Sequence, residues 1–334
     1  MNGNSDITQE ELSKAGNIIN QLMSYYKARI VGQEELGRSL LIALMANGHI
    51  LLESVPGLAK TTAAKIVTNA VAGSFSRIQC TPDLLPSDII GGQIFNYSTS
   101  SFETKLGPVF ANFVLLDEIN RSSAKTQSAM LEAMQERQTT IGGFVYRMPK
   151  VFIVIATQNP VEQEGTYALA EAQMDRFLIK EVLDYPSPSE EVEVLSRIEA
   201  NIINDGTAIL SLMDVVFLEY LTSKVYIDNS VKEYITKIVD ATRYPDKYIN
   251  HDYAKYITMG GSTRASIAFM ECGKANALMH GRTYVTPDDI KELAHRILRH
   301  RITLSFAATA NNIKVETIID EIMKAIPTPW KQNI

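Results

Sequence analysis

Short apolar runs separated by helical patterns dominate the first half of the chain. Residues 50–52, 113–116 and 151–156 are apolar without alternation, and residues 75–80 and 177–182 form further strand-like segments. Runs of this kind are typical of parallel strands that are buried on both faces. Because helical patterns separate them, the sequence predicts an α/β fold with a doubly wound parallel sheet and helices on both faces.

Two amphipathic helices are predicted before the first strand, and two hairpins interrupt the α/β pattern. Thr8-Gln-Glu-Glu11 has the pattern of a capping box, and an apolar helical stripe follows it. A second stripe covers residues 36–45. One hairpin is predicted at about 93–106 and another at 139–146, where Gly142-Gly143 separates two strand-like segments.

Tyr185-Pro-Ser-Pro188 marks the predicted domain boundary, because strand signals fade beyond it. We expect an α/β domain over residues 1–186 and a smaller all-α domain over residues 187–334. The helices of the second domain are predicted at about 189–203, 211–222, 229–242, 262–280, 287–299 and 313–325.

The first strand leads into residues that suit phosphate binding. Ile50-Leu-Leu-Glu-Ser-Val-Pro-Gly-Leu-Ala-Lys-Thr-Thr62 has the order strand, turn, Lys-Thr and helix, which is the layout of a P-loop. There, backbone N–H groups and a helix N-terminus bind phosphates, the lysine reaches the outer phosphates, and the hydroxyl binds Mg²⁺. Thr61 is therefore a predicted magnesium ligand. The predicted nucleotide-binding residues are Ser54, Val55, Pro56, Gly57, Leu58, Ala59, Lys60, Thr61 and Thr62.

The match to the P-loop pattern G-x-x-x-x-G-K-[ST] is imperfect, because Ser54 and Ala59 occupy both glycine positions. A side chain at Ser54 crowds the loop if that residue needs a positive φ or a close backbone approach. On this window alone, the alternative is a buried strand followed by an ordinary helix with Lys60 at the surface.

Polar residues also follow two other apolar strands. Asp117-Glu118 comes after residues 113–116, and Asn159 comes after residues 151–156. Taken alone, the Asp-Glu pair is more often a solvated turn, and Asn-Pro is a turn signal. In an open α/β sheet, however, ligands bind outside the carboxyl ends of the strands. Together with Lys60 and Thr61 the pattern predicts that Asp117 binds Mg²⁺, Glu118 polarises the attacking water, and Asn159 orients it or contacts the γ-phosphate.

Composition and charge describe an ordinary globular chain. The chain has 334 residues, of which 46% are hydrophobic and 21% charged, and its net charge of −6 argues weakly against a nucleic-acid-binding body. Two cysteines, Cys80 and Cys272, are expected to be buried thiols. No apolar run approaches the ~18 residues of a membrane span, and no signal region begins the chain, so we expect a cytoplasmic protein.

These features together resemble MoxR-type ATPases of the AAA+ superfamily, in the branch with an insert in helix 2, here at about 91–106. The resemblance extends from about Val31 to Ile302. Its motifs are Val31-Gly-Gln33, Val55-Pro-Gly-Leu-Ala-Lys-Thr61, Leu85-Pro-Ser-Asp88, Gly107-Pro108, Leu116-Asp-Glu-Ile-Asn-Arg121, Ala156-Thr-Gln-Asn-Pro160, Glu171-Ala-Gln-Met-Asp-Arg-Phe177, Gly261-Ser-Thr-Arg-Ala265 and Ile297-Leu-Arg-His-Arg301.

The resemblance implies further site residues. Val31-Gly32 is similar to the adenine-side contact, Arg176 to an arginine finger offered to a neighbouring subunit, and Arg264 to the sensor 2 arginine of the lid. It also implies that Asp117 and Glu118 form the Walker B pair and that Asn159 is sensor 1. Each arginine also has an interpretation without a catalytic role. Arg176 could form a surface ion pair with Asp175, and Arg264 could be a solvated residue at the start of a helix. Arg121 and Arg137 are candidates for contacts between subunits, but solvated helix residues are the expected interpretation of each.

For function, the resemblance implies an ATP- and Mg²⁺-dependent ATPase that acts as a chaperone or remodeller of client proteins. It implies a homo-oligomeric ring, expected to be a hexamer, and partners with von Willebrand factor A domains. Two alternatives stay open. One is a motor subunit of a metal chelatase or of a complex that acts on nucleic acid. The clearest basic cluster of this chain, which such a complex could use to bind nucleic acid, is Arg296, Arg299, His300 and Arg301. The other is a nucleotide-gated scaffold with little turnover, suggested by Ser54.

Overall fold

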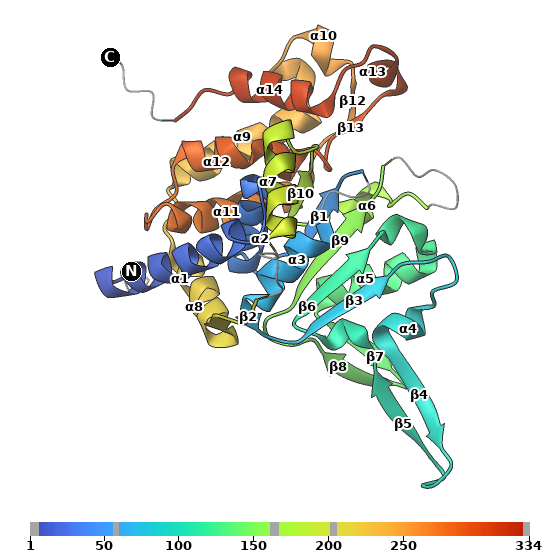
Figure 1. Ribbon diagram of the computed structural model, residues 1–334. Coiled ribbons are helices and arrows are strands. Elements are labelled where there is room, and N and C mark those ends of the chain that lie inside the picture. Colours follow the sequence, from blue (N-terminus) through green and yellow to red (C-terminus); the bar gives the residue numbers. More distant parts are fainter. Residues whose placement is uncertain (1–6, 56–59, 161–166, 201–205, 330–334) are drawn as a thin grey trace, which may run out of the picture.

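A five-stranded parallel sheet forms the centre of the molecule (Figure 1). The computed structural model describes residues 7–55, 60–160, 167–200 and 206–329. The strand order is β10-β1-β9-β6-β3, and every neighbouring pair is parallel. The strands are β1 (Ile50–Glu53), β3 (Phe75–Gln79), β6 (Phe113–Asp117), β9 (Ile153–Gln158) and β10 (Ile179–Val182). The predicted doubly wound parallel sheet is confirmed.

Two hydrophobic cores lie on opposite faces of this sheet. Ile50 and Leu52 belong to one core, whereas Leu51 between them belongs to the other. The first core is covered by α1 (Gln9–Lys27), α2 (Glu34–Met45) and α3 (Lys60–Asn69), and the second by α4 (Pro86–Ile90) and α5 (Ala124–Glu136). Successive side chains of a strand point to opposite faces, so burial on both faces explains the apolar runs without alternation.

Both predicted hairpins are present. The first pairs β4 (Gly91–Asn96) with β5 (Ser101–Leu106), and the second pairs β7 (Gln138–Ile141) with β8 (Phe144–Arg147). Figure 1 shows β4 and β5 extending well beyond the sheet. The Tyr146 hydroxyl donates a hydrogen bond to Thr104 Oγ1 at 3.0 Å and joins the two hairpins. Gly142 and Gly143 both have positive φ, as the two-residue turn requires.

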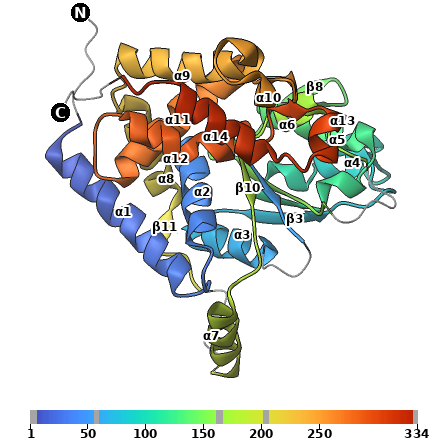
Figure 2. The same cartoon turned by 90° about the horizontal axis from the view of Figure 1, so that it is seen from above.

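Helices dominate the chain after β10. They are α7 (Pro188–Glu199), α8 (Leu212–Lys224), α9 (Asn229–Arg243), α10 (His251–Ala254), α11 (Thr263–Met279), α12 (Pro287–Leu298), α13 (Phe306–Ala310) and α14 (Val315–Ala325). Residues 201–203, where the first of these helices was predicted to end, lie outside the described residues. Figure 2 shows α7 projecting from the body, and none of its described side chains is buried.

Two short strand pairs within or beside this helical part were not predicted. The strand β11 (Leu210–Ser211) pairs with β2 (Val71–Ala72), and β12 (Ile257–Met259) pairs with β13 (Thr303–Leu304). Each has only two or three residues, which is too short for a pattern in the sequence to show. One hydrophobic core also continues from the first sheet face into α8, α9, α11 and α12. Because the two halves share this core, packing does not separate them, and the domain boundary near residue 186 stays a prediction.

Long apolar helices are absent from the described part of the chain, where no helix is long and apolar enough to cross a membrane. Both cysteines are buried, as expected. Burial raises the pKa of the Cys80 thiol to about 12, because the thiolate would lose its hydration.

Candidate nucleotide-binding site

The sheet order brings the predicted phosphate-binding residues together. The strand β9 lies between β1 and β6, so all three carboxyl ends reach the same edge. Ser54 follows β1, Asp117 ends β6, and Asn159 follows β9. Glu53 pairs with Gln158 in the register of β1 and β9. Three segments that are far apart in sequence thus form one polar edge.

Lys60 lies inside this edge and not at the surface. It begins α3, and the residue is only 9% exposed. Its Nζ atom donates hydrogen bonds to the carbonyl oxygens of Ser54 at 2.8 Å and Gln158 at 3.3 Å. The surface alternative for Lys60 is therefore wrong. Pro56, Gly57, Leu58 and Ala59 lie outside the described residues, while Thr62 is exposed in the first turn of α3.

Ser54 is accommodated without left-handed backbone. It is not among the residues with positive φ, and its side chain is buried. Its hydroxyl donates a hydrogen bond to the carbonyl oxygen of Val55 at 2.9 Å, and its N–H donates to Gln158 O at 3.3 Å. Ser54 therefore lacks the backbone strain that a serine would have if this glycine position required a positive φ.

We expect the variant Ser54→Gly to bind Mg-ATP within about twofold of the parent affinity, because no strain at Ser54 is relieved. It should be less stable by about 0.5–1 kcal/mol, since glycine loses more conformational freedom on folding. Titration calorimetry and thermal unfolding measure the two effects. Markedly tighter ATP binding by the variant would contradict this prediction.

The oxygen atoms of Thr61 and Asp117 converge as a magnesium site requires. Thr61 Oγ1 lies 3.3 Å from Asp117 Oδ2, and Asp117 Oδ1 accepts a hydrogen bond from Thr157 Oγ1 at 2.8 Å. No group of three or more His, Cys, Asp or Glu side chains suited to a metal occurs within the described ranges. A hydroxyl and one carboxylate nevertheless fit Mg²⁺, which takes its remaining ligands from waters and nucleotide phosphates.

Arg77 was not predicted as a site residue, yet it contacts Asp117. Its Nε and Nη2 atoms lie 3.1 and 2.5 Å from Asp117 Oδ2. The strand β3 pairs with β6 and places Gln79 opposite Asp117, which is how Arg77 reaches this carboxylate. The Arg77 side chain is 48% exposed. The Asp117 side chain is only 10% exposed, so the pair is partly shielded from solvent, and a bound cation would share Oδ2 with Arg77 or displace its half-exposed side chain.

Glu118 is held at the same edge by three neighbours. Its backbone is left-handed, with φ of 58°, and its N–H donates a hydrogen bond to Thr157 Oγ1 at 2.8 Å. Its Oε2 atom accepts hydrogen bonds from Gln79 Nε2 at 3.2 Å and Arg121 Nη1 at 3.1 Å. Arg121, expected to be solvated, is thus an ion-pair partner of Glu118. Left-handed backbone at a non-glycine residue is uncommon and often marks a functional site.

Asn159 is buried directly after β9. Its carbonyl oxygen accepts a hydrogen bond from Asn120 Nδ2 at 3.3 Å, which connects it to the segment that follows Glu118. Asn159 therefore belongs to the same edge as Asp117 and Glu118, as predicted.

Val31 and Gly32 line a neighbouring pocket of about 200 Å³. Leu183, Tyr185 and Glu190 contribute to its wall, so it lies between α2, the end of β10 and the start of α7. Gly32 has φ of +65°, and a Cβ atom there would meet Glu190 Oε1 at 2.3 Å. Glycine is favoured at this position, because other residues are strained in this left-handed backbone and a Cβ atom would displace the Glu190 side chain. The pocket suits the adenine-side contact that was predicted for Val31 and Gly32.

Arg176 and Arg264 lie away from this edge. Leu178 N–H donates a hydrogen bond to His49 O just before β1, and Ile179 pairs with Ile50, so Arg176 is near the amino ends of the strands. Arg264 donates a hydrogen bond to Gln135 Oε1 at 3.2 Å, near the end of α5. The four residues of β1, at about 3.3 Å each, span roughly 13 Å between the two edges.

Arg176 does not form an ion pair with Asp175, which was the interpretation of this residue without a catalytic role. Asp175 pairs instead with Arg301 at 2.7 Å and Arg264 at 3.7 Å. Arg176 Nε is buried and has no hydrogen-bond partner among the described residues. Arg137, also expected to be solvated, donates hydrogen bonds to Asn47 O and Oδ1 at 2.6 and 2.8 Å within the subunit.

The basic cluster near residue 300 is not a nucleic-acid surface. Arg296, His300 and Arg301 are buried, and the side chain of Arg299 is 12% exposed. Arg296 pairs with Glu181 at 3.1 Å, and His300 Nε2 lies 3.1 Å from Phe177 O. These side chains pack α12 against β10, so they are unavailable to phosphates of DNA or RNA.

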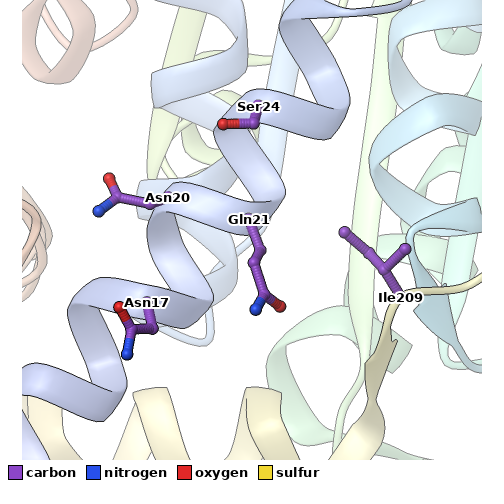
Figure 3. A pocket seen from close by; sticks show the side chains of 5 residues that line it. All are labelled: Asn17, Asn20, Gln21, Ser24 and Ile209. Atoms are coloured by element: carbon purple, nitrogen blue, oxygen red, sulfur yellow. The ribbon is translucent and has the colours of Figure 1, made fainter.

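A further hollow of about 540 Å³ lies on the outer face of α1, well apart from the predicted phosphate-binding residues. Figure 3 shows that four uncharged polar side chains of α1 and one side chain from the segment before β11 line it. They are Asn17, Asn20, Gln21, Ser24 and Ile209. This hollow contains no titratable group, and we assign it no chemistry.

Comparison with known proteins agrees with the fold. Residues 49–179 match the family described as "ATPase family associated with various cellular activities (AAA)". Residues 251–322 match the AAA lid domain.

Relatives match over most of the chain. Chaperone MoxR1 of Mycobacterium tuberculosis is 44% identical, over 91% of this chain and 80% of its own. Protein MoxR of Paracoccus denitrificans is 29% identical, over 90% of this chain and 93% of its own. A solved structure from Cytophaga hutchinsonii is 45% identical and superposes with a TM-score of 0.89, over 96% of this chain and 97% of its own. The chain therefore belongs to the MoxR family of AAA+ ATPases.

Proposed function

We propose that this protein binds ATP with Mg²⁺, hydrolyses it, and uses the cycle to remodel partner proteins. The observation that carries the proposal is the polar edge formed by Lys60, Thr61, Asp117, Glu118 and Asn159 at the ends of three adjacent strands. The name of Chaperone MoxR1, 44% identical, supports a role on protein clients.

Each residue at this edge has a distinct task. Lys60 exchanges its carbonyl partners for the β- and γ-phosphates, and the backbone N–H groups at the start of α3 face the same charge. Thr61 and Asp117 hold Mg²⁺, which neutralises charge on the phosphates when it is bound. Glu118 accepts a proton from, or polarises, the attacking water. Asn159 orients that water or contacts the γ-phosphate, while Val31 and Gly32 contact the adenine.

The place of Arg176 supports the proposal of a ring assembly. It lies at the amino edge of the sheet, whereas the phosphate-binding residues of its own subunit lie at the carboxyl edge. Arg176 therefore serves the γ-phosphate of a neighbouring subunit, and a homo-oligomeric ring, a hexamer by family resemblance, repeats this contact. Client proteins and a partner with a von Willebrand factor A domain would bind such a ring in the cytoplasm.

The alternatives are less well supported. The basic cluster does not support a nucleic-acid motor, because Arg296, His300 and Arg301 are buried. A scaffold with little turnover was suggested by Ser54, but Ser54 has no left-handed backbone. A chelatase subunit shares the fold, and no feature of the described edge favours it over a chaperone.

The variant Lys60→Ala tests the site directly. We expect its affinity for Mg-ATP to fall by about 10²-fold or more, because hydrogen bonds to charged groups contribute about 1.5–3 kcal/mol each and the lysine serves two phosphates. Titration calorimetry measures the affinity, and Lys65→Ala, in the same helix, is the matched control. Unchanged ATP affinity in a folded Lys60→Ala protein would rule out the P-loop assignment.

A further inference from the structure

The backbone that carries Arg176 is held from the helical half of the chain. The side chain of Arg301 is 2% exposed. Its Nη2 atom donates hydrogen bonds to Phe177 O at 2.7 Å and Asp175 O at 3.3 Å, and Nη1 donates to Leu178 O at 3.3 Å. Three carbonyl oxygens on both sides of Arg176, of residues 175, 177 and 178, thus accept hydrogen bonds from this one guanidinium group, which also donates to Ile297 O at 2.6 Å.

Asp175 completes this arrangement through its carboxylate. Oδ1 accepts a hydrogen bond from Arg301 Nε at 2.7 Å, and Oδ2 accepts one from Ser262 Oγ at 2.7 Å. Oδ2 also lies 3.7 Å from Arg264 Nη1. Ser262 is the N-cap of α11, and Arg301 follows α12. Asp175 therefore connects two segments of the helical half to the residue immediately before Arg176.

The segment itself, which ends before Phe177, is only partly buried, and Met174 is its one side chain that packs against the second core. The helix α6 (Glu171–Met174) has four residues, none of them buried, and it ends just before Asp175. Phe177 is the first buried residue after it. A buried guanidinium needs a charged partner and satisfied hydrogen bonds, since its desolvation is costly. Arg301 and Asp175 meet that need for each other while they fix the intervening backbone.

We propose that Asp175 and Arg301 are positioning residues that present Arg176, together with Arg264, to the nucleotide of a neighbouring subunit. This inference rests on the proposed function, in which Arg176 acts across a subunit interface. The Arg264 side chain is 46% exposed and lies 3.7 Å from the carboxylate of Asp175, the residue that precedes Arg176. In this proposal Asp175 and Arg301 act through Arg176 and are assigned no contact of their own with the phosphates.

The test uses a mixture of two inactive proteins. Lys60→Ala supplies intact arginines, and Arg176→Ala supplies an intact P-loop, so only interfaces that pair the two are complete. We place Asp175→Asn in one protein or the other and measure ATP turnover of each mixture. Asparagine keeps the size and one oxygen acceptor, but removes the charge that pairs with Arg301 and Arg264.

We expect the position of Asp175→Asn to decide the result. When Asp175→Asn is placed in the Lys60→Ala protein, it lies beside the only Arg176 present in the mixture. ATP turnover of the mixture should then fall by about 10–10²-fold, as expected for a catalytic group displaced by about 1 Å. In the Arg176→Ala protein it should change turnover less than twofold. Equal losses from both positions, or no loss from either, would overturn the inference, because a general structural role does not distinguish the two subunits.

Controls separate this inference from its premise. Two affinity tags on the mixture prove co-assembly, and absence of rescue in the parent mixture despite co-assembly would refute the action of Arg176 across the interface. Arg301→Lys keeps the charge but loses the planar fork, and should give the same asymmetric loss. Asp246→Asn, at a side chain that is 71% exposed, is the matched control and should leave rescue unchanged. Thermal unfolding confirms that each variant is folded.

Discussion

Glu118→Gln is expected to bind Mg-ATP as tightly as the parent protein and to lose turnover by about 10²–10⁴-fold. The carboxylate lies at the carboxyl edge of the sheet, where Gln79 and Arg121 hold Oε2 and Thr157 accepts the hydrogen bond of the backbone N–H. A glutamine fits the same space, but it neither accepts a proton nor polarises water as a carboxylate does. Steady-state phosphate release and calorimetry measure the two quantities.

The companion variant Asp117→Asn separates water activation from metal binding. It should require more Mg²⁺ for half-maximal nucleotide binding, since Asp117 is the carboxylate that faces Thr61 Oγ1. Glu321→Gln, at an ion pair with Lys324 on α14, is the matched control and should be fully active. If Glu118→Gln hydrolyses ATP at the parent rate, the role assigned to Glu118 is wrong. If it does not, the ATP-bound variant is a bait for client proteins.

The sequence was sufficient for the central sheet and for most of the polar edge. Apolar runs without alternation identified β1, β6 and β9, because both faces of these strands are buried. The polar residues at their ends were then placed together by a general property of parallel sheets, namely that all carboxyl ends lie on one edge. Asp117, Glu118 and Asn159 needed no other information.

Other features depend on which elements become neighbours, and local patterns do not contain that information. Arg77 and Gln79 reach Asp117 and Glu118 only because β3 lies beside β6. Arg301 looks in the sequence like an ordinary charge at a helix end, yet it is buried because α12 ends against the segment before β10. Ion pairs between distant segments are therefore the part of the site that required the structure.

Arg176→Ala is expected to bind ATP normally and to lose turnover by about 10³–10⁵-fold, because a guanidinium at the γ-phosphate stabilises charge in the transition state. Arg176 lies at the edge of the sheet opposite the predicted phosphate-binding residues of its own subunit, so in the proposed function a neighbour supplies this charge to each site. Specific activity of the parent protein should accordingly rise with protein concentration until assembly is complete. Turnover assays across a dilution series measure this.

Mixing Arg176→Ala with Lys60→Ala should restore part of the activity, because some interfaces then pair an intact P-loop with an intact arginine. The matched control is Glu118→Gln mixed with Lys60→Ala. This mixture should show no rescue, because both changes lie at the same edge of the sheet and no interface has a complete site. Turnover that is independent of concentration, together with no rescue in proven co-assemblies, would place Arg176 outside the chemistry of the neighbouring site. Rescue would show that a lone subunit is an incomplete enzyme, since one edge of its sheet binds the nucleotide while the other edge supplies the arginine to the next subunit.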